Sequence, residues 1–320
     1  MTPADLSLTV QHAVRRAVDD GALRVEVPPA VRVEKARPGG VGEYASSVAL
    51  SLARPAGRPA LDVASVLKER LDGAAGILAV DITGPGFLNF TLRPGGGADV
   101  VAAVRAAGPS YGRGDALAGE SFLFEPAAEA RAQVVVGCLV GLLTGQGGTA
   151  GVGAGGERPH VHPGTYDAEA LGTDAARWRL LRAAPHDRPL DGPPLLVRHE
   201  RNPLFRVQYA HSRARRLLVN GAQLGVLPDH GTDVDHPLVG LLRDHPDVLL
   251  AAARHRAPDR VARHLEAVAD ALLGFQHTVL PLGDEKPSVA HRSRLALAEA
   301  AGTVLAGGLS VLGISAPDRI

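Results

Sequence analysis

An arginine-rich stretch with a helical pattern is the part of this sequence best suited to chemistry. It reads NPLFRVQYAHSRARRLL and runs from Asn202 to Leu218. Asn202 can cap a helix, and Pro203 suits the first helical turn. Apolar residues then recur at helical spacing and form one packed side: Val207, Ala210, His211, Ala214, Leu217 and Leu218.

The other side of this expected helix carries guanidinium groups. Arg206, Arg213 and Arg216 fall there, with Tyr209 and Arg215 nearby. Guanidinium groups pair with phosphate and carboxylate, so the pattern predicts a surface for nucleic acid or for an acidic partner. An ordinary solvated basic face is the alternative that charge alone leaves open.

Two further motifs give weaker signals. The glycine-rich segment Gly145–Gly156 lacks the Lys-Ser/Thr pair of a P-loop and has no strand directly before it. We therefore interpret it as a flexible connector. His160 and His162 flank a valine, but no cysteine or carboxylate pair stands at ligand spacing. The sequence therefore predicts neither a cofactor nor a metal site.

Composition narrows the class of protein. A chain of 320 residues predicts two or three domains, and its net charge of zero means that any nucleic-acid contact must use a local patch. The single cysteine, Cys138, excludes an internal disulfide and fits a reducing compartment. The N-terminus shows no signal pattern, and the longest apolar run, Val134–Leu143, is too short to cross a bilayer. We therefore expect a cytoplasmic protein without membrane contact.

Residues 1–94 have the pattern of a small α+β domain. We expect helices at Leu6–Asp20, Tyr44–Leu52 and Val63–Leu71, and strands at Ala30–Arg37, Ile77–Ile82 and Phe87–Leu92. The sequence Gly84-Pro85-Gly86 predicts a tight turn that makes the last two strands antiparallel.

The remaining chain predicts a short α/β segment at 95–197 and an all-α bundle at 198–320. In the first we expect helices at Asp99–Ala107, Ala127–Leu143 and Leu171–Arg182, and a buried strand within Glu120–Pro126. In the second, beyond the arginine-rich helix, we expect helices at Pro237–Asp244, Pro246–Arg256, Pro258–Leu280 and Ser288–Ala306. Gly307-Gly308 is expected to end the last helix.

These patterns resemble the arginyl-tRNA synthetase family at both ends of the chain. NPLFRVQYAHSRARRLL resembles the helix that opens the family's anticodon-binding domain. GEYASSVALSLA (Gly42–Ala53) with ITGPGFLNFTL (Ile82–Leu92), and the tail from Arg292 to Ile320, match in the family's order. The resemblance implies a tRNA-elbow domain at 1–94, a degenerate remnant of the catalytic domain at 95–197 and a DALR-type anticodon-binding domain at 198–320.

In the first domain, the resemblance implies that Phe87 and Asn89 contact a base of the tRNA D-loop. A ring offers a stacking face and an amide reads a base edge, so the residue types suit this role. From the residues alone, the alternative is a structural role for both, with Phe87 as a core ring and Asn89 as a polar group at a strand end.

In the helical domain, the resemblance implies RNA contacts on the arginine-rich helix and near residue 276. Tyr209, His211 and Arg213 match the family pattern, whereas Arg206 stands where the family usually has tyrosine. Gln276 stands where a tyrosine commonly faces the anticodon. With Arg216 on the same helix, these residues predict general tRNA affinity more firmly than recognition of one anticodon.

The middle of the chain departs from the family. In the family, the helix after the strand that matches ESFLFEP begins with a His-x-Gly-His signature, but in this chain the corresponding segment Ala127–Leu143 contains no histidine. Pro163–Asp167 stands where the family has its Lys-Met-Ser-Lys loop. A full nucleotide-binding domain needs on the order of 100–200 more residues than this chain provides. Adenylyl transfer depends on such phosphate-binding groups. We therefore predict that the protein does not make arginyl-adenylate.

Three hypotheses for function follow. The first is a non-catalytic relative that binds tRNA, such as an arginine tRNA, through both ends. The second is a protein-interaction or regulatory module that reuses the anticodon-binding fold for a protein partner without RNA. The third is a residual arginine–tRNA ligase, which the missing signatures disfavour.

Overall fold

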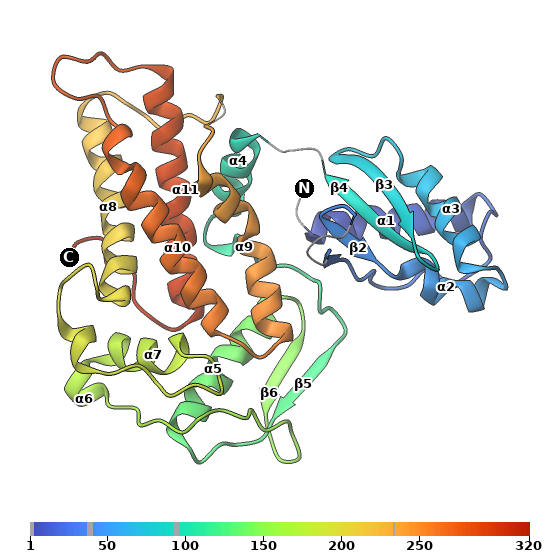
Figure 1. The fold of residues 1–320 in the computed structure, drawn as a ribbon, viewed down its shortest axis with the longest axis horizontal. Helices are drawn as coiled ribbons and strands as arrows, with labels where there is room; N and C mark the ends of the chain where they lie inside the picture. Colours follow the sequence, from blue (N-terminus) through green and yellow to red (C-terminus); the bar gives the residue numbers. More distant parts are fainter. Residues whose placement is uncertain (1–2, 37–40, 93–95, 233) are drawn as a thin grey trace. The chain divides into compact units, whose positions relative to one another are not determined.

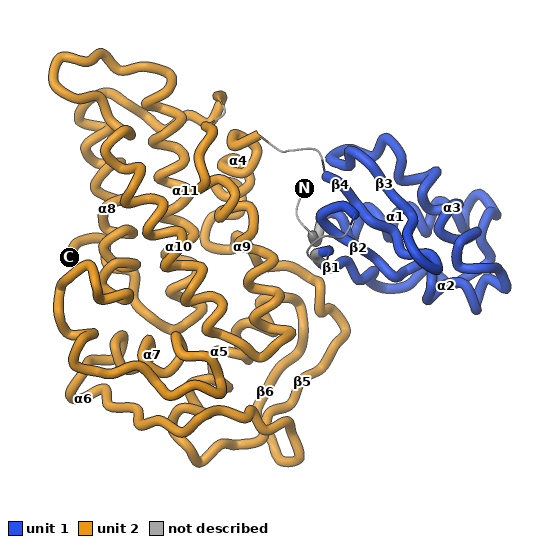
Figure 2. The backbone as a smooth tube through the Cα atoms, viewed as in Figure 1, with its two compact units in different colours: residues 1–95 blue, residues 96–320 orange. Residues whose placement is uncertain are grey.

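A computed structural model describes residues 3–36, 41–92, 96–232 and 234–320. The chain divides into two compact units, residues 1–95 and 96–320 (Figure 2). Each unit has its own hydrophobic core. The expected boundary between residues 197 and 198 lies within the second unit and stays a prediction.

In its described residues, unit 1 is an α+β domain in which three helices accompany a four-stranded antiparallel sheet (Figure 1). The helices are α1 (Pro3–Asp19), α2 (Val48–Ala56) and α3 (Ala60–Leu71). The strands are β1 (Glu34–Lys35), β2 (Tyr44–Ser46), β3 (Ile77–Thr83) and β4 (Phe87–Leu92), in the spatial order β1-β2-β4-β3. The predicted pairing of the last two strands is confirmed, with Phe90 opposite Val80.

Alternation along β4 explains which face of the sheet is buried. Leu88, Phe90 and Leu92 belong to the core of unit 1, whereas Phe87 between the turn and Leu88 is partly exposed. Successive strand residues point to opposite faces, so Phe87 and Asn89 share the face away from the core.

Two expectations for unit 1 were wrong. The segment Tyr44–Ser46 is a strand paired with β4, and the helix begins only at Val48. Helical spacing of the later apolar residues masked a strand too short to show its own period. The expected strand at Ala30–Arg37 reduces to Glu34–Lys35, and its last residue lies outside the described residues.

Unit 2 is mainly helical, with one small parallel sheet (Figure 1). Its first part contains α4 (Gly97–Ala107), the 3-10 turn η1 (Gly108–Ser110), β5 (Ser121–Phe124), α5 (Ala130–Gly145), β6 (Thr149–Val152), α6 (Ala168–Leu171), α7 (Thr173–Arg182) and the turn η2 (Pro193–Leu196). The bundle follows with α8 (Pro203–Gln223), α9 (Pro237–Arg254), α10 (Asp259–Phe275), the turn η3 (Gln276–Thr278) and α11 (Val289–Val311). One core runs through both parts, from Val100 to Ile314.

We expected the glycine-rich segment Gly145–Gly156 to be a flexible connector, and this expectation was wrong. Its residues Thr149–Val152 form β6, which pairs in parallel with β5 across α5. Glycine suits this place because a Cβ on Gly156 would lie 2.5 Å from the carbonyl carbon of Phe124. The strand β5 is also less buried than expected, because Leu123 is exposed and only Phe124 is fully buried.

Two helix ends in the bundle also differ from expectation. Pro246 lies inside α9, which continues through it to Arg254. Gly307 and Gly308 lie inside α11 and do not end it. A Cβ on Gly308 would lie 2.5 Å from Leu265 Cδ2 on α10, so this glycine permits two helices to approach closely.

The helix α11 is long and apolar enough to cross a bilayer by length and composition. However, 61% of its most apolar window is buried within the protein, which places it as the core helix of unit 2. Its hydropathy is therefore explained by packing against α8 and α10.

Candidate nucleic-acid interface

In unit 1, Phe87 and Asn89 line a shared hollow on the face of the sheet away from the core. The hollow measures about 510 Å³, and Arg32, Ser47 and Thr83 also line it. The Phe87 side chain is 37% exposed, so its ring is open to a ligand. The structure thus brings together the two residues for which the family resemblance implies contact with one base.

Asn89 is far less accessible than Phe87, with 7% of its surface exposed. Its Nδ2 donates to Thr83 Oγ1 at 2.7 Å, which orients the amide. Among the described residues, no donor is bonded to its Oδ1. An amide held in this way can offer its oxygen as an acceptor, but only to a group that enters the hollow.

In unit 2, α8 begins as the sequence predicted. The Phe205 N–H donates to Asn202 Oδ1 at 3.1 Å, and Pro203 occupies the first turn. Asn202 is buried, and its Nδ2 donates to the carbonyls of Leu195 at 2.8 Å and Val197 at 2.9 Å. This cap therefore also fixes the loop that leads into α8.

An aromatic pair stands near the start of α8. The rings of Phe205 and Tyr209 stack with centroids 5.7 Å apart and planes 15° apart, and Tyr209 is 38% exposed. Sequence reasoning selected Tyr209 but missed Phe205. The signal was present, because side chains four residues apart on a helix are neighbours.

A second hollow, of about 580 Å³, lies beside this pair. Phe205, Gln208, Arg198 and Arg319 are among the residues that line it. A partly exposed ring next to a hollow with guanidinium groups at its edge has the chemistry of a single-stranded RNA site.

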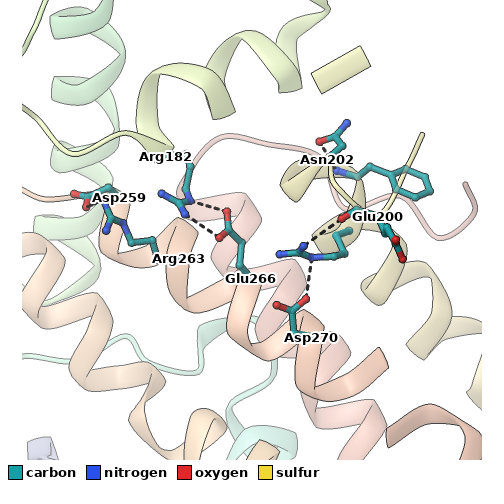
Figure 3. Close-up of polar contacts among 9 residues, drawn as sticks. Arg182, Glu200, Asn202, Asp259, Arg263, Glu266 and Asp270 are labelled. Carbon is teal, nitrogen blue, oxygen red and sulfur yellow. Dashed lines mark hydrogen bonds and ion pairs between the residues drawn. The ribbon is translucent and has the colours of Figure 1, made fainter. Parts of the chain in front are cut away.

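Arg206, predicted from the sequence as an RNA contact, is engaged by groups of the protein itself. Its Nε lies 2.8 Å from Asp270 Oδ1 on α10, and its Nη1 donates to the Glu200 carbonyl at 3.2 Å. Figure 3 shows Asp270 and Glu266 on the same helix, where Glu266 accepts from Arg182 at 2.6 Å and 3.0 Å. Arg206 therefore joins α8 to α10, and its charge is matched by a carboxylate.

Arg213 and Arg216 have different surroundings. Arg213 Nε donates to Gln276 Oε1 at 2.5 Å, so two of the predicted residues contact each other across α8 and η3. Arg216 is exposed and forms no ion pair with any described residue. Neither guanidinium group is neutralised by a carboxylate in the part of the chain that the structure describes.

His211 is buried, so its expected role as a direct RNA contact is not supported by its placement. Its Nδ1 lies 3.1 Å from the Pro317 carbonyl, which can only accept, so Nδ1 carries the proton. Burial lowers the pKa of His211, with a weaker opposing effect from Pro317, so the ring is neutral at neutral pH. Arg215 joins the same contact by pairing with Asp318 at 3.2 Å. This side of α8 binds the C-terminal tail.

The start of α5 is where a helix following a parallel strand would face an anion. Here the Glu129 carboxylate occupies that place and accepts the N–H groups of Arg131, Ala132 and Gly164 at 3.1, 2.8 and 2.7 Å. Burial acts to raise the pKa of Glu129, but these three N–H groups outweigh it and lower the pKa. The helix N-terminus is therefore filled by the protein's own carboxylate.

Arg131, at the start of α5, joins this helix to the surrounding segments. It is fully buried and donates to five backbone carbonyls, each 2.7–3.0 Å away: those of His162, Leu180, Ala183, Ala184 and Asp187. Its charge is satisfied by the chain itself. Within the described residues, no three His, Cys, Asp or Glu side chains gather as metal ligands.

Comparison with known proteins agrees with the resemblance noted from the sequence. Residues 6–92 match the model of the arginyl tRNA synthetase N terminal domain, and residues 207–320 match that of the DALR anticodon binding domain. A curated arginine–tRNA ligase of Paenarthrobacter aurescens is 43% identical over 162 residues, which cover 47% of this chain. That match covers 29% of the ligase, so less than a third of the relative's length is represented.

Solved structures agree on the fold. Thermus thermophilus arginyl-tRNA synthetase superposes with a TM-score of 0.59 at 13% identity, covering 100% of both chains. The Plasmodium falciparum enzyme gives a TM-score of 0.58 at 7% identity, again covering 100% of both chains. At such identities the similarity concerns the fold alone.

Proposed function

This chain is a relative of the arginyl-tRNA synthetases with both the N-terminal domain and the DALR anticodon-binding domain, and we propose that it binds tRNA without charging it. The observation that supports tRNA binding is that each matched domain exposes an aromatic side chain beside a hollow. Phe87 lines the hollow of unit 1, and in unit 2 the exposed Tyr209 stacks on Phe205, which lines the second hollow. Exposed rings with adjacent amide and guanidinium groups suit unpaired bases. Because the matched domains are those of arginyl-tRNA synthetases, we infer that the ligand is an arginine tRNA in the cytoplasm.

The proposal that the chain does not charge tRNA rests on its middle. The chain lacks most of a catalytic domain by length, since only residues 93–206 separate the two matched domains. The helix N-terminus that could receive a phosphate group is filled by Glu129, and Arg131 faces inward to backbone carbonyls. These contacts favour a self-contained structural segment over an ATP site.

Filter binding of purified protein to total tRNA at low salt tests the first part. We expect saturable binding that weakens as salt rises, because phosphate contacts release counterions. Failure to retain tRNA at any protein concentration would refute it. Arginine-dependent pyrophosphate exchange tests the second part, and we expect no signal above a blank without protein.

One observation favours a protein partner as a second candidate. Large apolar side chains are exposed at the far end of α8, in the loops that follow α8 and precede α11, and at the start of α11: Val219, Leu224, Leu227, Leu282 and Val289. The loop after α8 lies against the first turn of α11, because the Asp229 N–H donates to the Arg292 carbonyl at 3.2 Å. A partner recovered equally with and without ribonuclease treatment, from a protein that retains no tRNA, would favour this candidate.

A further inference from the structure

The arginines of α8 differ in what neutralises them. Arg206 lies 2.8 Å from the carboxylate of Asp270, whereas Arg213 contacts the uncharged amide of Gln276. A carboxylate competes with RNA phosphate for a guanidinium group, but an amide leaves the full positive charge available. The predicted basic stripe is therefore electrostatically uneven along the helix.

Gln276 also orients Arg213. The Gln276 Nε2 donates to the Leu273 carbonyl at 3.1 Å, near the end of α10, so the amide oxygen is left to face Arg213 Nε. With Nε engaged, Nη1 and Nη2 of Arg213 have no partner among the described residues. Two parallel N–H donors on a fixed guanidinium plane match the oxygens of a phosphate.

Spacing places this group beside the aromatic pair. Tyr209, Arg213 and Arg216 recur at positions four and three residues apart, so they share one side of α8. A single RNA strand on that side would meet a stacking surface first and two guanidinium groups next.

We propose that, among the predicted arginines of α8, Arg213, positioned by Gln276 and followed by Arg216, contacts phosphate, and that Arg206 does not. This inference rests on the proposed tRNA binding. Gln276 acts as a positioning residue, because it touches the guanidinium group and not the phosphate. Arg206 instead fastens α8 to α10 through Asp270.

The dependence of tRNA affinity on salt tests this assignment, because its slope counts phosphate contacts and does not report on packing. We compare Arg213→Gln with the double variant Arg206→Gln/Asp270→Asn, which removes the other guanidinium without changing net charge. We compare Gln276→Glu, whose carboxylate would engage Arg213, with Gln223→Glu, which adds the same charge at an exposed position of α8. Thermal melting of each variant reports whether it folds.

We expect Arg213→Gln and Gln276→Glu each to bind tRNA about tenfold more weakly, the order expected for one charge-assisted contact. Each should reduce the magnitude of the logarithmic salt slope by about 0.7–0.9, and the two controls should keep the wild-type slope. If the wild type binds tRNA but the Arg206 control loses as much slope as Arg213→Gln, or Gln276→Glu behaves like Gln223→Glu, the inference is overturned while tRNA binding stands. If the wild type binds no tRNA, the proposed function itself is refuted.

Discussion

Two buried histidines should make unit 2 unstable in mild acid. The rings of His245 on α9 and His264 on α10 stack 5.3 Å apart, and Tyr111 stacks on His245 at 6.0 Å. Among the described residues, His245 Nδ1 and His264 Nε2 have no hydrogen-bond partner. Burial, with added repulsion from His264, lowers the pKa of His245 to about 3. Burial lowers the pKa of His264 to about 4, against an opposing effect of Asp244.

The sign of the effect follows from where each state binds protons. Both folded-state pKa values lie below the ordinary 6.5, so between these values and pH 6.5 the unfolded chain binds more protons than the folded chain. Stability from this pair is therefore constant above about pH 7 and falls as pH drops through 6.5 toward the folded values. At about pH 5 each imidazole lowers the free energy of unfolding by about 2 kcal/mol relative to neutral pH, and the two together lower it by about 4 kcal/mol. This magnitude changes little if the folded pKa values shift lower.

Urea unfolding followed by tryptophan fluorescence measures this loss in the correct unit. The chain has one tryptophan, Trp178 on α7, which is fully buried in the core of unit 2. Its emission therefore reports unit 2 and not unit 1. We expect the free energy of unfolding to fall by at least about 4 kcal/mol between about pH 8 and about pH 5.

Carboxylates also titrate near the lower end of this range, so the comparison needs a variant without imidazoles. The double variant His245→Phe/His264→Phe keeps two rings in place, and any packing cost it carries does not depend on pH. Its loss of stability over the same pH range should be smaller than the wild-type loss by about 4 kcal/mol. An equal loss in both proteins would refute the assignment to this pair.

Three further predictions concern the core and the interface. Arg131→Met leaves buried carbonyls without donors and should lower the free energy of unfolding of unit 2 by about 3–5 kcal/mol, measured by the same urea titration. Tyr209→Ala removes an exposed stacking ring and should weaken tRNA binding by about 1–3 kcal/mol in filter binding, with unchanged thermal melting. Gly308→Ala places a Cβ 2.5 Å from Leu265 Cδ2 and should lower the melting temperature, whereas Gly307→Ala, whose nearest such neighbour is a carbonyl oxygen at 3.6 Å, should not.

Features set by neighbouring residues were predictable from the sequence. The cap of Asn202 on α8 depends on residues three apart, and the paired strands β3 and β4 depend on alternation around one turn. The family resemblance at both ends also followed from contiguous motifs, and the matches at residues 6–92 and 207–320 confirm it.

Features set by distant residues were not predictable in this way. The glycine pair at 307–308 looks like a helix stop until Leu265 on another helix is seen against Gly308. Arg206 looks free until Asp270 is placed beside it, and a core position for His211 does not reveal that its ring binds the Pro317 carbonyl. No local pattern specifies these partners, because packing of the bundle brings them together.

The pairing of arginines changes what the formal charge of this chain means for RNA binding. Guanidinium groups matched by carboxylates, as in Arg182 with Glu266 and Arg206 with Asp270, contribute little to a phosphate-attracting field. Among the described residues, the guanidinium groups near the aromatic pair that no carboxylate neutralises are then chiefly Arg213 and Arg216 on α8, with Arg198 and Arg319 at the hollow beside Phe205. Counterion release scales with the number of phosphates contacted, so binding by unit 2 should depend only weakly on salt and rely more on base stacking. A ligand with unpaired, accessible bases therefore fits this surface better than a regular duplex, which offers many phosphates but no free base faces.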